Sequence, residues 1–171
     1  MAPALKVVAV ADTHLRAGAD GALTRWLPPS AEPYLESADV ILHLGDLVEA
    51  PVLDRLRSYA PVHAVLGNND TGLERMLPAV LSLDLGGVQV GMIHDSGPAA
   101  GRVGRMARRF PSAGVVVFGH SHIPVVQEGL DGQMLFNPGS PTQRRGQPCH
   151  TLGVMEVSAG TVSRLEIVLL D

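Results

Sequence analysis

Apolar residues along the chain form several short continuous runs that each end in polar residues. The runs are rich in β-branched side chains, which is typical of strands buried on both faces. We predict four such strands, over residues 6–11, 40–44, 62–66 and 115–118. Helices are predicted over residues 31–37, 52–59 and 99–110, the last ending before Pro111. This alternation predicts parallel strands joined by right-handed crossovers.

The remaining segments have a different pattern, with short strands separated by tight turns. Residues 81–85 and 88–93 flank Gly86 and Gly87, a pair that is typical of a two-residue hairpin turn. Further strands are predicted over residues 125–127, 134–136, 151–157 and 162–170. Helices in the first half and hairpins in the second predict an α/β fold with a two-sheet core covered by helices.

Carboxylates, an amide and imidazoles follow the apolar runs. They are Asp12, His14, Asp46, Asn68, His94, His120 and His122. Because the carboxyl ends of parallel strands meet at one edge of a sheet, we expect these side chains to converge. This set of ligands would satisfy two divalent cations that share one bridging carboxylate. The sequence therefore predicts a binuclear metallohydrolase.

Taken singly, each of these residues also has a structural explanation. Asp12 and Asp46 suit helix N-caps or turns, and Asn68 suits a turn in the left-handed conformation. His94 alone suits a hydrogen-bonded core position. His120 and His122 would share one face of a strand but would diverge across a glycine turn. We favour the metal site because it accounts for all seven residues at once.

Composition narrows the class of protein. A chain of 171 residues with 46% hydrophobic and 18% charged residues predicts one globular domain over residues 1–171. A net charge of -4 argues against large nucleic acids as partners. No apolar run reaches the length of a membrane span or a signal peptide, so we expect a cytoplasmic protein without a membrane partner. The single Cys149 excludes an internal disulfide.

The order of the motifs carries a family resemblance. Along the chain they read Asp-x-His, Gly-Asp, Gly-Asn-x-Asp, His and Gly-His-x-His. This set resembles the calcineurin-like metallophosphoesterase superfamily. The short chain and the Asn-Pro-Gly-Ser segment at residues 137–140 resemble its small bacterial and archaeal phosphodiesterase branch, the YfcE-like family. The resemblance runs from about residue 6 to the C-terminus and implies a four-layer α/β/β/α sandwich of two mixed sheets flanked by helices.

The resemblance also implies two divalent transition-metal cations per chain. The first would be held by Asp12, His14, Asp46 and His122, and the second by Asp46, Asn68, His94 and His120. Asp46 would then be the bridge, with Asp46, Asn68 and His94 assigned as catalytic residues. Such a cation pair lowers the pKa of a bridging water and stabilises an in-line displacement at phosphorus. Mn²⁺ is favoured, and Fe²⁺, Ni²⁺, Co²⁺ and Zn²⁺ also suit mixed nitrogen and oxygen ligands.

The implied function is a metal-dependent phosphodiesterase that hydrolyses small phosphodiesters. Two alternatives remain open: a phosphomonoesterase or nuclease, and a non-catalytic binding module on the same fold, as in the retromer subunit that resembles this family. The intact ligand set argues against the binding module. The short chain without a cap domain favours small diesters, and exposed strand edges leave room for a homodimer.

Two positions depart from the superfamily pattern. Asn69 stands where many members have a histidine that protonates the leaving oxygen, and an amide cannot act as a general acid at neutral pH. Asp95 follows His94 where glycine is common. Its carboxylate would either brace a metal-bound imidazole or add negative charge to the site.

Other polar residues near the motifs are assigned supporting roles. Asp70 is predicted to orient a ligand imidazole or to fix its loop by hydrogen bonds. His43 and His63 lie inside predicted strands and are assigned to core or sheet positions. An arginine at Arg144 or Arg145 would fork onto a substrate phosphate. Residues 18–30 are predicted to form a long loop beside the site, and one helix face, predicted to be solvated, carries Arg102, Arg105 and Arg109.

Overall fold

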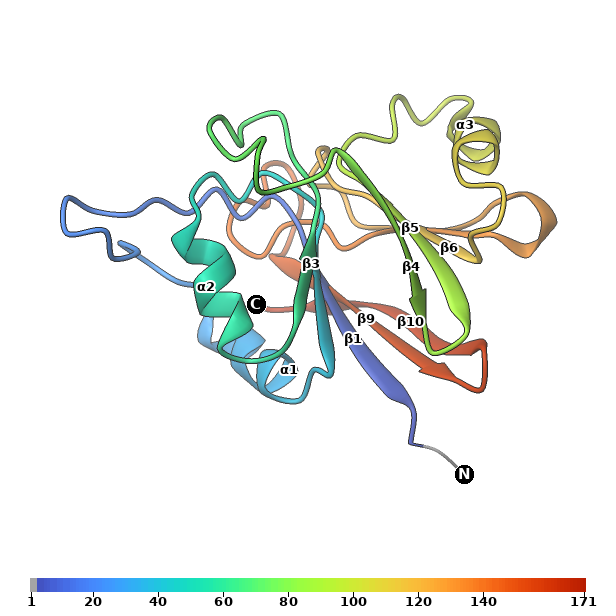
Figure 1. Ribbon diagram of the computed structural model, residues 1–171, viewed down its shortest axis with the longest axis horizontal. Coiled ribbons are helices and arrows are strands. Elements are labelled where there is room, and N and C mark those ends of the chain that lie inside the picture. Colours follow the sequence, from blue (N-terminus) through green and yellow to red (C-terminus); the bar gives the residue numbers. More distant parts are fainter. Residues whose placement is uncertain (1–2) are drawn as a thin grey trace.

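Two five-stranded mixed sheets pack face to face in the computed structural model, which describes residues 3–171 (Figure 1). Residues 1 and 2 of the predicted domain lie outside the described residues. The strands of the first sheet, in spatial order, are β10 (Thr161–Leu169), β9 (Thr151–Ser158), β1 (Leu5–Val10), β2 (Val40–His43) and β3 (Val62–Ala64). Those of the second are β4 (Val80–Leu85), β5 (Val88–Ile93), β6 (Val115–Val117), β8 (Met134–Asn137) and β7 (Val125–Glu128).

Helices cover the outer faces of both sheets. They are α1 (Glu32–Glu36), preceded by the 3₁₀ turn η1 (Pro29–Ala31), α2 (Pro51–Arg57) and α3 (Arg102–Arg109); a second 3₁₀ turn, η2 (Leu130–Gly132), precedes β8. Figure 1 shows α1 and α2 against the first sheet and α3 on the far side of the second. None of the helices in residues 3–171 is long and apolar enough to cross a membrane.

Three separate apolar clusters hold these layers together. The side chains of strand β1 alternate between two of these clusters. Val8 and Val10 belong to the cluster under α1 and α2, whereas Val7 and Ala9 belong to the cluster between the sheets. A third cluster, which includes Met106, packs α3 on the second sheet. One continuous apolar strand therefore contributes side chains to two apolar clusters, one on each face of its sheet. The predicted four-layer α/β/β/α fold is confirmed.

The strand directions bring several loops to one edge of the sandwich. Strands β1, β2 and β3 are parallel, as are β5, β6 and β8. The loops after β1 and β2 are joined by Asp12 N donating to Gly45 O at 3.0 Å, and those after β5 and β6 by Gly119 N donating to His94 O at 2.9 Å. At the opposite edge the two hairpin turns meet, where residue 160 N donates to residue 86 O at 3.0 Å.

Each predicted strand is present, with ends displaced by two residues at most. The helices are shorter than predicted. The third begins at Arg102 rather than at residue 99, because Gly101 adopts φ 75° and residues 99–101 form a turn. The Arg105 side chain donates to the Ala100 carbonyl at 2.9 Å and holds this turn in place.

Candidate metal centre

Asp46 lies at the centre of the polar cluster at the carboxyl edge. Its Oδ2 is 3.5 Å from Nε2 of His14 and 3.5 Å from Nε2 of His94. Asp12 lies beside it, with Oδ1 3.7 Å from Nε2 of His122 and 4.0 Å from Nε2 of His94. Two groups of ligand atoms result, Asp12 with His14 and His122, and Asp12 with Asp46 and His94, each within 4.8 Å.

Asn68 and His120 complete the cluster on its exposed side. Asn68 Oδ1 lies 2.9 Å from His94 Nε2 and 3.2 Å from His120 Nδ1. The His120 ring packs edge-on against His94, whereas the His122 ring stacks on His14, each with centroids 5.2 Å apart. The two histidines of the Gly-His-x-His motif therefore diverge, and the structure brings all seven predicted ligands together.

An unusual backbone conformation directs these side chains inward. Among the described residues, nine non-glycine residues have positive φ, and five of them are predicted ligands. These five are Asp12 (54°), His14 (44°), Asp46 (58°), His120 (71°) and His122 (60°). Each left-handed residue costs about 1–3 kcal/mol and persists only where its surroundings enforce it. Strain concentrated at these positions is typical of a functional site.

Two glycines allow the loops to approach closely. A β-carbon on Gly67 would clash with the backbone nitrogen and with Oδ1 of Asp46. A β-carbon on Gly45, which has φ 92°, would lie 2.6 Å from Nδ1 of His94. Glycine before Asp46 and before Asn68 is thus required by space and, at Gly45, also by conformation.

Asp70 fixes the loops that carry the ligands. Its Oδ2 accepts hydrogen bonds from the backbone nitrogens of Asp46 at 2.9 Å and Gly67 at 2.7 Å. Its Oδ1 accepts one from Val48 N at 2.7 Å. Of the two predicted roles for Asp70, the structure supports loop fixing, since its carboxylate binds backbone groups of two loops.

Backbone carbonyls orient two of the imidazoles, and the sequence did not predict these contacts. His94 Nδ1 donates to Leu44 O at 2.6 Å, and His122 Nδ1 donates to Gln143 O at 2.5 Å. A proton on Nδ1 leaves the lone pair on Nε2, the atom that faces the carboxylates, as in many metal-binding histidines. Carbonyl groups leave no mark on the amino-acid sequence, so no signal could have identified these partners.

Three buried polar atoms in the cluster have no hydrogen-bond partner among the described residues. They are Asp12 Oδ2, His14 Nε2 and His122 Nε2. Leaving such atoms unpaired costs about 1–3 kcal/mol each, so they are rare in folded proteins unless they serve another purpose. One carboxylate oxygen and two imidazole nitrogens are a donor set that a divalent cation accepts. The residues therefore fit the metal that the motifs predict.

Burial and mutual charge shift the titration of the cluster. Burial raises the pKa of Asp12 to about 7, opposed by His94 and reinforced by Asp46. Burial also acts to raise the pKa of Asp46, but the contacts with His94 and Asn69 together outweigh it and the pKa falls. For His94 burial is in turn outweighed by Asp46, the Leu44 carbonyl and Asp12 acting together, so its pKa rises. Burial lowers the pKa of both other inward-facing imidazoles, His14 and His122.

The prediction of a solvated arginine face is wrong for two of its three members. Arg102 Nε donates to Ser96 Oγ at 2.9 Å, and its guanidinium lies 4.9 Å from the Phe118 ring centroid. Arg105 Nε donates to Ser96 O at 3.2 Å. Both side chains fold back onto the loop after His94, where Ser96 accepts a hydrogen bond from each. They tie that loop to α3.

The exposed side of the cluster carries one further carboxylate. Asp95 Oδ1 accepts a hydrogen bond from Gly97 N at 2.7 Å, and its Oδ2 lies 3.9 Å from Nε2 of His120. The distance to the imidazole is too long for a hydrogen bond. Of the two predicted roles for Asp95, added negative charge near His120 is the one that fits.

Several other residues take defined positions around the centre. His43 is fully buried, with its ring bonded to Thr13 Oγ1 at 3.0 Å and to Gly45 N at 3.2 Å, as predicted for a core position. His63 is half-buried in β3. Arg144 donates to Pro148 O at 2.6 Å and is turned back on its own loop.

Arg145, by contrast, lies close enough for its charge to act on Asp12, His14 and His122. The loop that carries it is anchored by Ser140 Oγ, which donates to Asp12 O at 2.8 Å. Sequence reasoning noted Ser140 only as part of the Asn-Pro-Gly-Ser segment and missed this contact, although the segment itself was a usable signal.

Known proteins resemble this chain over most of its length. Residues 5–160 match the model of the calcineurin-like phosphoesterase superfamily domain. A probable metallophosphoesterase of Methanocaldococcus jannaschii is 32% identical over 152 residues, which cover 87% of this chain and 73% of that protein. Another, from Methanothermobacter thermautotrophicus, is 31% identical over 140 residues, which cover 80% of this chain and 77% of that protein.

A solved structure extends the similarity to the fold. Vacuolar Protein Sorting 29 of Cryptosporidium parvum has a TM-score of 0.77 at 17% identity, covering 98% of this chain and 100% of that chain. At this identity the likeness concerns the fold alone. Together with the matched domain model and the two archaeal relatives, the ordered motifs establish that this chain belongs to the calcineurin-like phosphoesterase superfamily.

Proposed function

We propose that this protein is a metal-dependent phosphodiesterase with a binuclear centre. The position of Asp46 carries the proposal, because its Oδ2 lies 3.5 Å from both His14 and His94 and serves both halves of the cluster. The first cation would be held by Asp12, His14, Asp46 and His122, and the second by Asp46, Asn68, His94 and His120. Mixed nitrogen and oxygen donors suit Mn²⁺, with Fe²⁺, Co²⁺, Ni²⁺ and Zn²⁺ as alternatives.

The division of labour follows from the donor set. Two such cations would supply Lewis acidity at the phosphoryl oxygens and a water of lowered pKa. The chain's own residues hold the donors in position: Leu44 O orients His94, and Asp70 fixes the Asp46 loop. The positive charge of Arg145, which acts on Asp12, would be available to a phosphate oxygen.

Two hollows flank the centre, and this favours a diester over a monoester. One, of about 450 Å³, is lined by Asn69 together with Arg16 and Glu49. The other, of about 370 Å³, is lined by Asn68 and His94. A phosphodiester carries two ester substituents, so each hollow would receive one of them. A monoester carries a single substituent and would leave one hollow empty.

The test is hydrolysis of bis(4-nitrophenyl) phosphate and 4-nitrophenyl phosphate by the purified protein, after chelation and after addition of Mn²⁺. We expect the diester to be the better substrate, its turnover to vanish on chelation and Mn²⁺ to restore it. A higher rate on the monoester would favour a phosphomonoesterase.

A binding module is the second candidate, favoured by the likeness to Vacuolar Protein Sorting 29. It predicts no hydrolysis of any diester with any of the five metals. Under that outcome the proposed activity would be withdrawn, even if the metal content of the protein were intact.

A further inference from the structure

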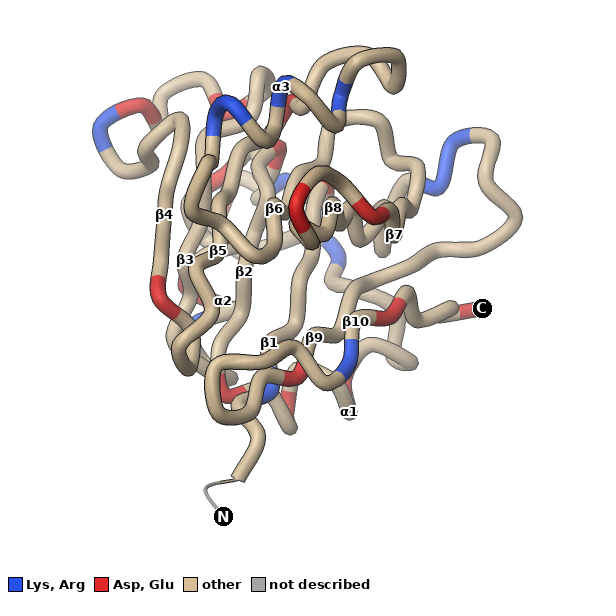
Figure 2. The backbone as a smooth tube through the Cα atoms, turned by 90° about the vertical axis from the view of Figure 1, so that its right-hand side faces the viewer, with Lys and Arg blue, Asp and Glu red and all other residues tan. Residues whose placement is uncertain are grey.

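Arg109, the last residue of α3, lines the hollow beside Asn68 and His94. Basic residues gather along this helix (Figure 2). Arg102 and Arg105 are engaged with the loop after His94, as described above. Arg109 differs from them, since its guanidinium forms no hydrogen bond and no ion pair within residues 3–171, and its side chain is exposed. A cation therefore faces the hollow without a partner.

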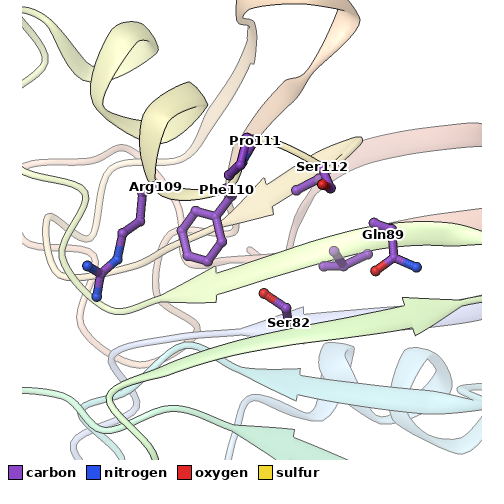
Figure 3. Close-up of a pocket in the computed structure, with 8 residues that line it drawn as sticks. Ser82, Gln89, Arg109, Phe110, Pro111 and Ser112 are labelled. Carbon is purple, nitrogen blue, oxygen red and sulfur yellow. The ribbon is translucent and has the colours of Figure 1, made fainter.

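Arg109 lines three hollows in all. Besides the one at the metal centre, it lines a hollow of about 410 Å³ with Ile93 and Met106. It also lines one of about 270 Å³ with Ser82, Gln89 and Phe110 (Figure 3). Figure 3 shows its side chain extending from the end of α3 toward the carboxyl end of β5, the strand that leads into His94. Arg109 is thus shared by the hollow at the metal centre and by two hollows lined in part by residues of β5.

The charges around this hollow favour the binding of an anionic group at the Arg109 guanidinium. A guanidinium presents a planar fork of donors that matches a carboxylate or a phosphate. Asp95 lines the same hollow, but its Oδ1 is bonded to Gly97 N and its Oδ2 faces His120. Its Oδ2 therefore faces His120 and its charge also acts on Arg102, and Arg109 is the arginine among the lining residues.

We propose that Arg109 determines substrate specificity by binding a second anionic group, a carboxylate or a phosphate, on one ester substituent of the diester. The preferred substrates are then small phosphodiesters of acidic alcohols, with the acidic substituent in the hollow beside Asn68 and His94. This proposal rests on the phosphodiesterase function, because it assigns one of the two ester substituents to that hollow.

The experiment compares four 4-nitrophenyl phosphodiesters with the Mn²⁺-supplied protein. The second alcohol carries a three-carbon chain ending in methyl, carboxylate, phosphate or ammonium. We expect kcat/KM for both anionic substrates to exceed that of the methyl compound by about tenfold or more, mainly through KM, as one charge-assisted hydrogen bond provides. Arg109→Gln should remove this preference, and Arg109→Glu should shift it to the ammonium compound.

Arg108→Gln is the matched control. Arg108 is the neighbouring exposed arginine on α3 and does not line the hollow at the metal centre, so its loss should leave the preference intact. A second readout is inhibition by butylphosphonate and 4-carboxybutylphosphonate, which cannot be hydrolysed as esters. The carboxylated compound should inhibit more tightly, and Arg109→Gln should abolish the difference.

Each outcome bears on one proposal. If the methyl compound is hydrolysed but all four substrates have equal kcat/KM, the role of Arg109 is refuted and the phosphodiesterase function stands. An equal loss in the Arg108 and Arg109 variants would also refute it, since general charge would then explain the effect. If only the phosphate or only the carboxylate compound gains, the anion is thereby identified. Hydrolysis of none of the four would refute the phosphodiesterase function itself.

Discussion

Asn69 donates two hydrogen bonds to Asp46, from its backbone nitrogen to Oδ1 and from its side-chain Nδ2 to Oδ2, both at 2.8 Å. The residue that replaces the histidine of many superfamily members therefore holds the central carboxylate. Position 69 also lines one of the two hollows beside the centre. A side chain there is within reach both of the ligands and of a bound ester.

Asn69→His should restore acid assistance to the leaving group. An alkoxide leaving group needs a proton in the transition state, whereas nitrophenolate does not, so only poor leaving groups should benefit. We expect kcat for alkyl leaving groups to rise by up to about 10²–10⁴-fold with little change for activated esters, measured across a leaving-group series. Asn69→Ala is the control, which removes the amide without adding an acid. An equal gain across the whole series would contradict the assignment.

Asp46→Ala should release both of the cations proposed above. Asp46 Oδ2 is equidistant from His14 and His94, so its loss removes a ligand from each half of the cluster. His14→Ala and His94→Ala should each weaken mainly one half. Metal analysis of the purified variants, with circular dichroism to verify folding, provides the measurement. An Asp46→Ala protein that keeps about two metals per chain would show that Asp46 does not bridge.

Gly67→Ala should disrupt the centre from the backbone. The added β-carbon clashes with Asp46 N and Oδ1, so the loops after β2 and β3 must separate. We expect a loss of about 1–3 kcal/mol in the free energy of unfolding, together with reduced metal content. Gly146→Ala is the matched control, because nothing lies within 4 Å of a β-carbon there and its φ is not positive. Equal stability of the two variants in denaturant titrations would contradict this account.

His43 should make the protein acid-sensitive. Burial lowers its pKa from 6.5 to about 3, so the unfolded chain binds a proton before the folded one as the pH falls. The stability that His43 contributes is complete above pH 6.5 and is lost as the pH falls from there toward about 3. The slope approaches about 1.4 kcal/mol per pH unit.

His43→Gln keeps a donor and an acceptor in place but does not titrate. When the pH is lowered from about 6.5 to about 5, the free energy of unfolding of the metal-free wild type should fall by about 1.6 kcal/mol more than that of the variant. Parallel stability curves for the two proteins would show that another group is responsible.

Much of the site was predictable because its signals are local. A β-branched run that ends in Gly-Asp or Gly-Asn identifies a buried strand followed by a tight loop, and this placed Asp46 and Asn68 in the loops after β2 and β3, where the structure has them. The roles of Arg102 and Arg105 were not predictable in this way. A long flexible side chain finds partners only after tertiary packing has placed carbonyl groups around it, and no sequence spacing records that.

Long-range strand pairing was equally absent from the local pattern. Residues 151–157 were predicted as a strand, but their pairing with β1, with Val7 opposite Met155, depends on the whole fold. The left-handed conformations of Asp12 and His14 were missed too, because they arise from loops that bond to one another, as in His14 N donating to Asp46 O at 2.9 Å.

The origin of the ligands in two different sheets has a mechanical consequence. The loops after β1, β2 and β3 extend the first sheet, and those after β5 and β6 extend the second. Cations bound between them would clasp the two sheets at this edge, as the contact between residues 86 and 160 does at the other. Separating the sheets would then require breaking coordination bonds as well as exposing the apolar layer. The free energy of unfolding of the sandwich would then rise with the concentration of free metal ion in its surroundings.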